Sequence, residues 1–129
     1  MTDQIPKQDW KQFFNELSKI KLGWQTKVEV LKDDIGAQIL SNGLPFMGLM
    51  FEENPNVQNS FEIMLGEESG VHQTHTIFYP QKVFFESGET GENATLEIED
   101  ESGAKTIVYF VQPILVPAIY QETQIVAQF

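Results

Sequence analysis

The chain has 129 residues, of which 41% are hydrophobic, and a formal net charge of −11. This length fits one domain, and ten phenylalanines give enough apolar surface for a core, which excludes an intrinsically disordered chain. The absence of cysteine excludes a disulfide-framework mini-protein and a thiolate metal site. We therefore predict a single domain over residues 1–129.

The basic residues are few and of one kind, because all eight are lysines and arginine is absent. Nucleic-acid binders neutralise phosphates and often grip them with guanidinium groups, so we expect no nucleic-acid partner. An anionic membrane surface is disfavoured by the same repulsion. The first residues lack the pattern of a secretory signal and the apolar runs are too short to span a bilayer, so we expect a cytoplasmic protein.

The charge is distributed unevenly along the chain. Residues 1–32 carry six lysines and four acidic residues, whereas the remainder carries two lysines and fifteen acidic residues. We interpret the acidic part as a solvated surface that maintains solubility. The alternative is an acidic docking face for a basic partner.

The first predicted element is a helix over residues 6–21. Its apolar residues recur at helical spacing and form one stripe, which consists of Trp10, Phe13, Phe14, Leu17 and Ile20. Pro6 fits the first turn, and Gly23 can adopt the left-handed conformation that ends a helix. We expect this stripe to pack on a sheet.

Between residues 24 and 111, short apolar stretches alternate with turn sequences, which is typical of an antiparallel sheet. Asn42–Gly43 is interpreted as one of the turns. The predicted strands are 24–32, 37–41, 46–51, 57–65, 71–78, 82–86, 94–99 and 105–111. Strands 82–86 and 105–111 are apolar on both faces, so we expect the helix to cover one face and another apolar segment the other.

The predicted fold is therefore α+β. An N-terminal helix packs on a strongly curved antiparallel sheet of seven or eight strands, which forms a half-barrel or a barrel-like structure.

The last part of the chain, residues 112–129, is an apolar tail interrupted by prolines. Pro113 and Pro117 disfavour a regular helix or a central strand. The candidate interaction surface consists of Ile114, Leu115, Val116, Ile119 and Tyr120. We expect these residues either to complete their own domain or to dock on a second copy, and of the two we favour a homodimer.

The two histidines are the residues most suggestive of chemistry. In a strand, His72 and His75 point to opposite faces, so we expect no joint zinc site, a half-buried His75 and an exposed His72. The acidic stretch 86–101 lacks the spacing of an EF-hand, and no nucleophile elbow, P-loop or dinucleotide fingerprint occurs. We predict no catalytic residue, no metal ligand and no cofactor.

Two functions remain open. The favoured one is a non-enzymatic binding or protein-interaction module. The alternative is a small-molecule enzyme or carrier with a pocket on the concave face of the sheet, lined by His75, Phe84 and Tyr109. A closed apolar concavity with convergent polar groups would favour the alternative, and a flat apolar face buried against a second copy would favour the module.

Several short motifs resemble a known family. They are Ile5-Pro6, Trp10, Phe13-Phe14, Leu17-Ser18, Gly36-Ala37-Gln38, Leu44-Pro45, Gly48 and His72-x-x-His75-x-Ile77-x-x-Pro80. Over about residues 5–111 the chain is similar to family 5335 of the domain-of-unknown-function series, with the tail from Pro113 outside the pattern. The resemblance implies a bacterial cytosolic protein. It supplies no catalytic residues, because the family has no assigned activity.

The charge pattern leads to a first prediction. At near-physiological salt the protein should show no saturable binding to duplex or single-stranded oligonucleotides, because it would repel their phosphates. Fluorescence anisotropy with labelled oligonucleotides measures this. Micromolar affinity that falls steeply with salt would contradict the prediction.

Overall fold

The described part of the chain forms one α-helix and eight strands. The computed structural model describes residues 2–53, 59–67, 70 and 72–113. The elements in chain order are β1 (Thr2–Ile5), a 3-10 turn (Lys7–Asp9), α1 (Trp10–Ile20), β2 (Gln25–Lys32), β3 (Gly36–Glu52), β4 (Ser60–Gly66), β5 (His72–Phe78), β6 (Pro80–Ser87), β7 (Asn93–Asp100) and β8 (Lys105–Val111). The predicted α+β class with an N-terminal helix is confirmed.

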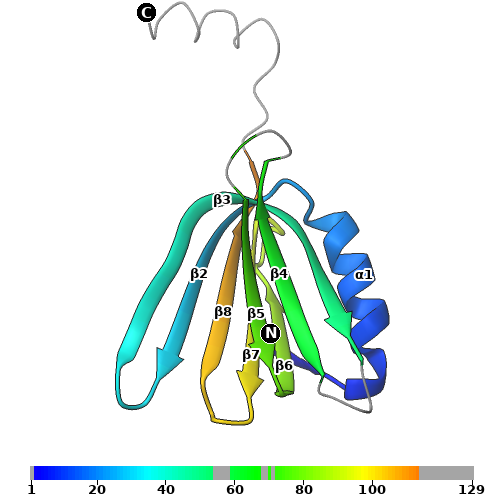
Figure 1. Cartoon of the computed structure of the whole chain (residues 1–129). Helices are drawn as coiled ribbons and strands as arrows, with labels where there is room; N and C mark the ends of the chain where they lie inside the picture. Colours follow the sequence, from blue (N-terminus) through cyan, green and yellow to red (C-terminus); the bar gives the residue numbers. More distant parts are fainter. Residues whose placement is uncertain (1, 54–58, 68–69, 71, 114–129) are drawn as a thin grey trace, which may run out of the picture.

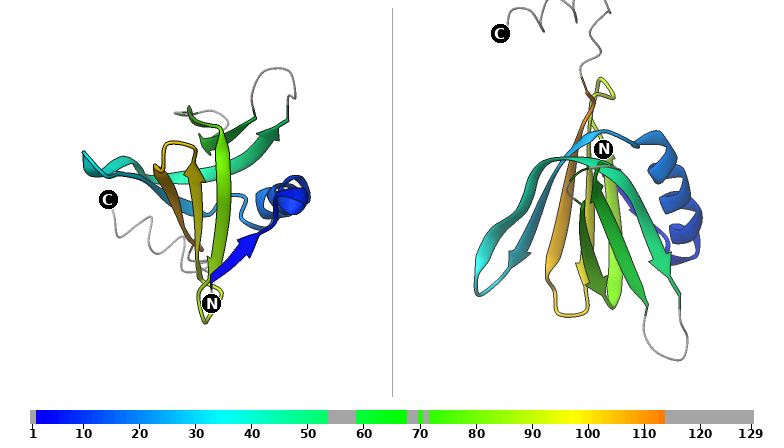
Figure 2. Two further views of the ribbon diagram at one scale, coloured as in Figure 1. Left: turned by 90° about the horizontal axis from the view of Figure 1, so that it is seen from below. Right: turned by 45° about the horizontal axis from the view of Figure 1, so that its top comes forward.

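The strands form one antiparallel sheet in the order β1-β6-β7-β8-β2-β3-β4-β5. The sheet is not closed, because β1 and β5 are its two edges, although Tyr79 alone connects β5 to β6. The strands converge at one end and splay at the other, so the sheet resembles an open cone (Figures 1 and 2). Of the two predicted variants, this is the half-barrel.

Strand β3 is continuous where two strands and a turn were predicted. Its first part pairs with β2 and its second part pairs with β4. Thr26 lies opposite Leu44 and Lys27 lies opposite Asn42, so Gly43 is an extra residue in β3. Its φ of +98° suits such a bulge. The predicted turn was wrong because an Asn-Gly pair serves a β-bulge as well as a hairpin.

The N-terminus also differs from the prediction. The α-helix begins at Trp10 rather than at Pro6, and β1 precedes it as an edge strand that pairs with β6. The Trp10 indole N–H donates a hydrogen bond to the backbone oxygen of Ile5 at 3.0 Å, which ties β1 to α1. Nothing in four mostly exposed residues predicts a strand, because their conformation depends on the partner β6.

The core is built around the aromatic face of α1. Phe61 of β4 has an exposed fraction of 0%. Its ring makes edge-to-face contacts with Trp10 and Phe14 of α1 and with Phe51 of β3, at centroid distances of 5.1, 4.6 and 5.1 Å. The predicted stripe is buried as far as Leu17, but Ile20 is 62% exposed, so the contact ends one turn earlier than predicted.

Different elements pack on the inner faces of β6 and β8. Phe13 of α1 contacts Phe85 of β6 at 5.3 Å between ring centroids. The inner face of β8 is instead covered by β3, where Phe46 contacts Phe110 at 4.9 Å. The prediction that the helix covers both strands was therefore wrong for β8. The apolar tail, the segment expected to cover the other faces, lies from residue 114 onward outside the described residues.

The contact between α1 and β3 gives a second prediction. The Ser18 hydroxyl accepts a hydrogen bond from the buried Leu49 N–H at 2.9 Å and donates one to the Leu49 carbonyl at 3.3 Å. Ser18→Ala leaves both backbone groups unpaired, so the free energy of unfolding should fall by about 1–3 kcal/mol. Urea unfolding measures it. The exposed Asn15→Ala is the control, and an equal loss in both variants would contradict this role.

Candidate functional site

Two hollows bear on function. The first, called here the wide-end hollow, lies between the splayed ends of the strands on the concave side of the cone. Its volume is about 260 Å³. It is lined by Val30, Lys32, Gln38, Leu40, His75, Thr76, Ile77, Phe78, Asp100, Ala104 and Thr106. The Gln73 amide donates a weak hydrogen bond to the Leu40 carbonyl at 3.4 Å, which joins β5 to the first half of β3 across this hollow.

Exposed apolar side chains gather at the wide end of the cone. The described residues expose nine large apolar side chains, and five of them belong to the β2–β3 hairpin and the β5–β6 corner. These five are Ile35, Ile39, Leu40, Phe78 and Tyr79. Leu40 and Phe78 line the hollow, whereas Ile39 lies opposite Glu29 on the outer face. Phe78, which lines the hollow, is 52% exposed. Clustered exposed apolar groups are typical of binding surfaces, whereas isolated ones need no explanation.

The corner between β5 and β6 has an unusual backbone. Tyr79 has a φ of +53°, the one positive φ of a non-glycine residue in the described part of the chain. A bulky side chain rarely adopts this conformation, which costs about 1–3 kcal/mol. The Tyr79 N–H donates to Asn59 at 3.1 Å and its carbonyl accepts from the Glu101 N–H at 3.0 Å, so three segments hold the corner in place.

Carboxylates occupy the two hairpin tips beside the wide-end hollow. Asp33 and Asp34 lie in the β2–β3 turn, and Asp100 and Glu101 lie at the β7–β8 turn. One oxygen of Asp100 accepts hydrogen bonds from the N–H and the hydroxyl of Ser102 and from the Ala104 N–H. These bonds fix that carboxylate at the rim of the hollow.

His75 is the titratable group on the floor of the wide-end hollow. It lies opposite Ile63 in β4 and is half-buried, whereas His72 is exposed, as predicted. Burial lowers the pKa of His75, because it disfavours the charged imidazolium. The imidazole is therefore neutral near pH 7 and can accept a proton or a hydrogen bond.

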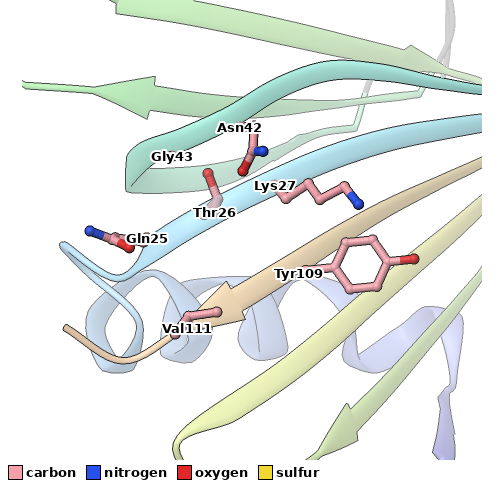
Figure 3. Close-up of a pocket in the computed structure, with 7 residues that line it drawn as sticks. All are labelled: Gln25, Thr26, Lys27, Asn42, Gly43, Tyr109 and Val111. Carbon is pink, nitrogen blue, oxygen red and sulfur yellow. The ribbon is translucent and has the colours of Figure 1, made fainter. Parts of the chain in front are cut away.

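The second hollow, called here the outer-face hollow, lies on the outside of the cone where β2, β3 and β8 are neighbours (Figure 3). Its volume is about 330 Å³. It is lined by Gln25, Thr26, Lys27, Asn42, Gly43, Tyr109 and Val111. The Lys27 amine lies 5.4 Å from the centroid of the Tyr109 ring, a cation–π distance.

Tyr109 is held by carboxylates on the same face. Its hydroxyl donates a hydrogen bond to Glu29 at 3.3 Å. Burial, the charge and hydrogen bond of Glu29, and the charge of Glu97 all raise the pKa of Tyr109. The phenol is therefore a neutral donor and is not poised to ionise near pH 7.

The structure separates the three residues of the predicted pocket. His75 lines the wide-end hollow on the inside of the cone, and Tyr109 lines the outer-face hollow on the outside. Phe84 lies opposite Glu97 in β7 and lines neither hollow. The candidate interaction surface lies outside the described residues, and it consists of Ile114, Leu115, Val116, Ile119 and Tyr120.

Sequence reasoning missed Leu40, Phe78 and Tyr79. A signal was available in Phe78-Tyr79-Pro80, where two aromatic residues directly precede a proline, the first residue of β6. Leu40 gave no such signal, because the bulges in β3 change which face it occupies.

Among the described residues, no three or more histidine, aspartate or glutamate side chains are grouped so that they could hold a metal ion. The helix in this part of the chain is too short and too polar to cross a membrane.

The position of His75 gives a third prediction. Because its pKa is lower in the folded state than the unfolded value of 6.5, its contribution to stability is present above that value and is lost as the pH falls through 6.5 toward the folded pKa. Between about pH 8 and about pH 5, wild type should lose more free energy of unfolding than His75→Gln. Urea titrations at several pH values measure this, with the exposed, non-titrating Asn15→Ala as a control that should follow wild type. Parallel curves for wild type and His75→Gln would contradict the prediction.

Comparisons with known proteins identify relatives of this chain. No solved structure matches it. An uncharacterised protein of the bacterium Aquifex aeolicus (strain VF5) is 30% identical over 116 residues, which are 90% of this chain and 97% of that protein. A family model matches residues 1–119, so the expectation that the tail from Pro113 lies outside the family pattern was wrong as far as residue 119. The chain therefore belongs to DUF5335, a family of unknown function.

Proposed function

We propose that this protein is a non-enzymatic binding module that accepts an apolar side chain from a basic segment of a partner protein in the wide-end hollow. The observation that carries this proposal is the cluster of exposed apolar side chains at the wide end of the cone, of which Leu40 and Phe78 line that hollow. Its size supports an anchoring role, because 260 Å³ lies just below the range of small-molecule pockets, about 300–1,000 Å³.

Apolar residues supply the affinity in this proposal. Ile77 and Val30 form buried walls of the hollow, and Phe78 also lines it but leaves about half of its surface exposed to solvent. An inserted side chain would remove apolar area on both partners from water, at about 25 cal/mol per Å² before the costs of association. Anchors of this kind carry most of the energy of an interface.

Charge supplies the preference for a basic partner. The region contains two lysines, Lys32 and Lys105. They are outnumbered by four carboxylates, which belong to Asp33, Asp34, Asp100 and Glu101. A surplus of negative charge around an apolar hollow attracts lysine and arginine side chains that flank an apolar anchor. It also makes the rate of association depend on salt.

The strained corner supports a binding role independently. A tyrosine at φ +53° costs free energy that a glycine or an asparagine would save. Its side chain is 47% exposed, so core packing does not require it. Backbone strain of this kind concentrates at binding and catalytic sites.

A second candidate function rests on His75. A neutral, half-buried imidazole in a concave hollow is suited to accept a proton, which a small-molecule enzyme or carrier would use. We rank it second because the hollow is small and open at the wide end of the cone. Binding of small neutral compounds at His75, with no peptide binding, would favour it.

The fourth prediction tests the module. Linear peptides selected by phage display against the full-length protein should contain an aromatic or aliphatic residue flanked by lysine or arginine. Phe78→Ser should weaken the selected peptides about tenfold or more, which corresponds to ~1.4 kcal/mol. Calorimetric titration measures the affinities. Leu22→Ser, which removes an apolar side chain that is more exposed than Phe78 (63% against 52%) and lies outside the hollow, should leave them unchanged.

Tyr79→Asn separates binding from stability. Asparagine tolerates a positive φ, so the variant should unfold at the same urea concentration as wild type or a higher one while its peptide affinity falls. Peptides without basic residues, or an equal loss of affinity in Phe78→Ser and Leu22→Ser, would rule out the proposal.

A further inference from the structure

The chain leaves β8 beside the outer-face hollow. Val111, the last residue of β8, lines this hollow and is 47% exposed although valine is apolar. The next residue, Gln112, is held by a hydrogen bond, because its N–H donates to the Glu92 carbonyl at 2.8 Å. The described chain therefore ends at Pro113, two residues from a wall of the hollow.

The outer-face hollow has room because of the bulge in β3. A side chain on Gly43 would meet no atom within 4 Å, so the space above this residue is open. Figure 3 shows the ring of Tyr109 and the aliphatic stem of Lys27 on one side of the hollow and Asn42 and Gly43 on the other. The hollow thus combines apolar walls with a few polar side chains at its rim.

The sequence that follows Pro113 matches these walls. Residues 114–120 are Ile-Leu-Val-Pro-Ala-Ile-Tyr and carry no charge. The family model includes all of them but the tyrosine, so they belong to the family pattern rather than to an unrelated extension. Three residues of extended chain span at most about 11 Å, so the tether between Val111 and this segment is short.

We propose that residues 114–120 fold back onto the outer face of their own chain and insert apolar side chains into the outer-face hollow. The short tether favours the chain's own segment over that of a second copy, because it raises the effective concentration to the millimolar range. Pro113 and Pro117 suit an insert that does not join the sheet, since each lacks a backbone donor. This contact goes beyond the proposed function, and it leaves the wide-end hollow free.

The experiment uses the full-length chain, whose lack of cysteine allows a nitroxide label at one chosen position. The label is attached at Ile39→Cys, on an exposed side chain of β3 that lies opposite Glu29, the residue that bonds the Tyr109 hydroxyl, in protein with isotope-labelled Ile, Leu and Val methyl groups. The expected result is loss of the Ile114 and Leu115 methyl signals. The same label at Asn15→Cys, on the exposed face of α1, should leave these signals intact.

Two further measurements complete the test. Tyr109→Ser, introduced into the protein with the nitroxide at position 39, should restore the lost signals. Unchanged methyl signals of the buried Ile63 and Leu96 show that the core of this variant is folded. In a mixture of protein that carries only the nitroxide and protein that carries only the isotope labels, the Ile114 and Leu115 methyl signals should not be lost. Loss in the mixture would assign the contact to a second copy. Equal effects of the labels at positions 39 and 15 would show that the segment does not dock, and either result overturns the proposal.

Discussion

The contact between the aromatic face of α1 and Phe61 is the interaction on which the rest of the structure depends. A curved sheet that does not close leaves one side of its interior open to water, and the helix fills that side with Trp10 and Phe14. The helix also replaces a missing strand, because the Ser18 hydroxyl bonds the Leu49 N–H and carbonyl that a neighbouring strand would have paired. Apolar burial and backbone pairing are thus satisfied by the same element.

The wide-end hollow is a consequence of this arrangement. Because α1 lies along the second half of β3, it seals one flank of the cone and does not reach the opposite flank, where the β2–β3 hairpin stands apart (Figure 2). The strand ends splay there, and no second helix fills the space between them among the described residues. The apolar side chains Leu40 and Phe78 therefore remain exposed at an end of the sheet that the core does not need.

The sequence predicted what depends on local periodicity and missed what depends on partners. In the predicted strands 57–65 and 94–99, apolar residues alternate with glutamates, which places Phe61, Ile63, Leu96 and Ile98 on the apolar faces, and all four are buried. Alternation did not reveal β1, whose conformation requires β6, nor the continuity of β3, since a glycine bulge and a glycine turn share their chemistry. The predicted pocket failed to assemble for a related reason. Phe84 and Tyr109 lie in stretches that are apolar on both faces, so alternation could not say which face is concave.

The uneven charge of the sequence becomes an asymmetry in space. The lysine-rich first part of the chain includes α1, where Lys11 and Lys19 are exposed on the flank of the cone. The acid-rich remainder supplies the β7–β8 turn at the wide end, where Asp100 and Glu101 join the carboxylates of the β2–β3 turn. A molecule with such separated charges orients an approaching basic partner before contact, because like charge on the flank repels it and opposite charge at the wide end attracts it. An acidic surface that served solubility alone would not need its carboxylates beside an apolar hollow, and this placement favours the docking interpretation of the acidic surface over the purely solvating one.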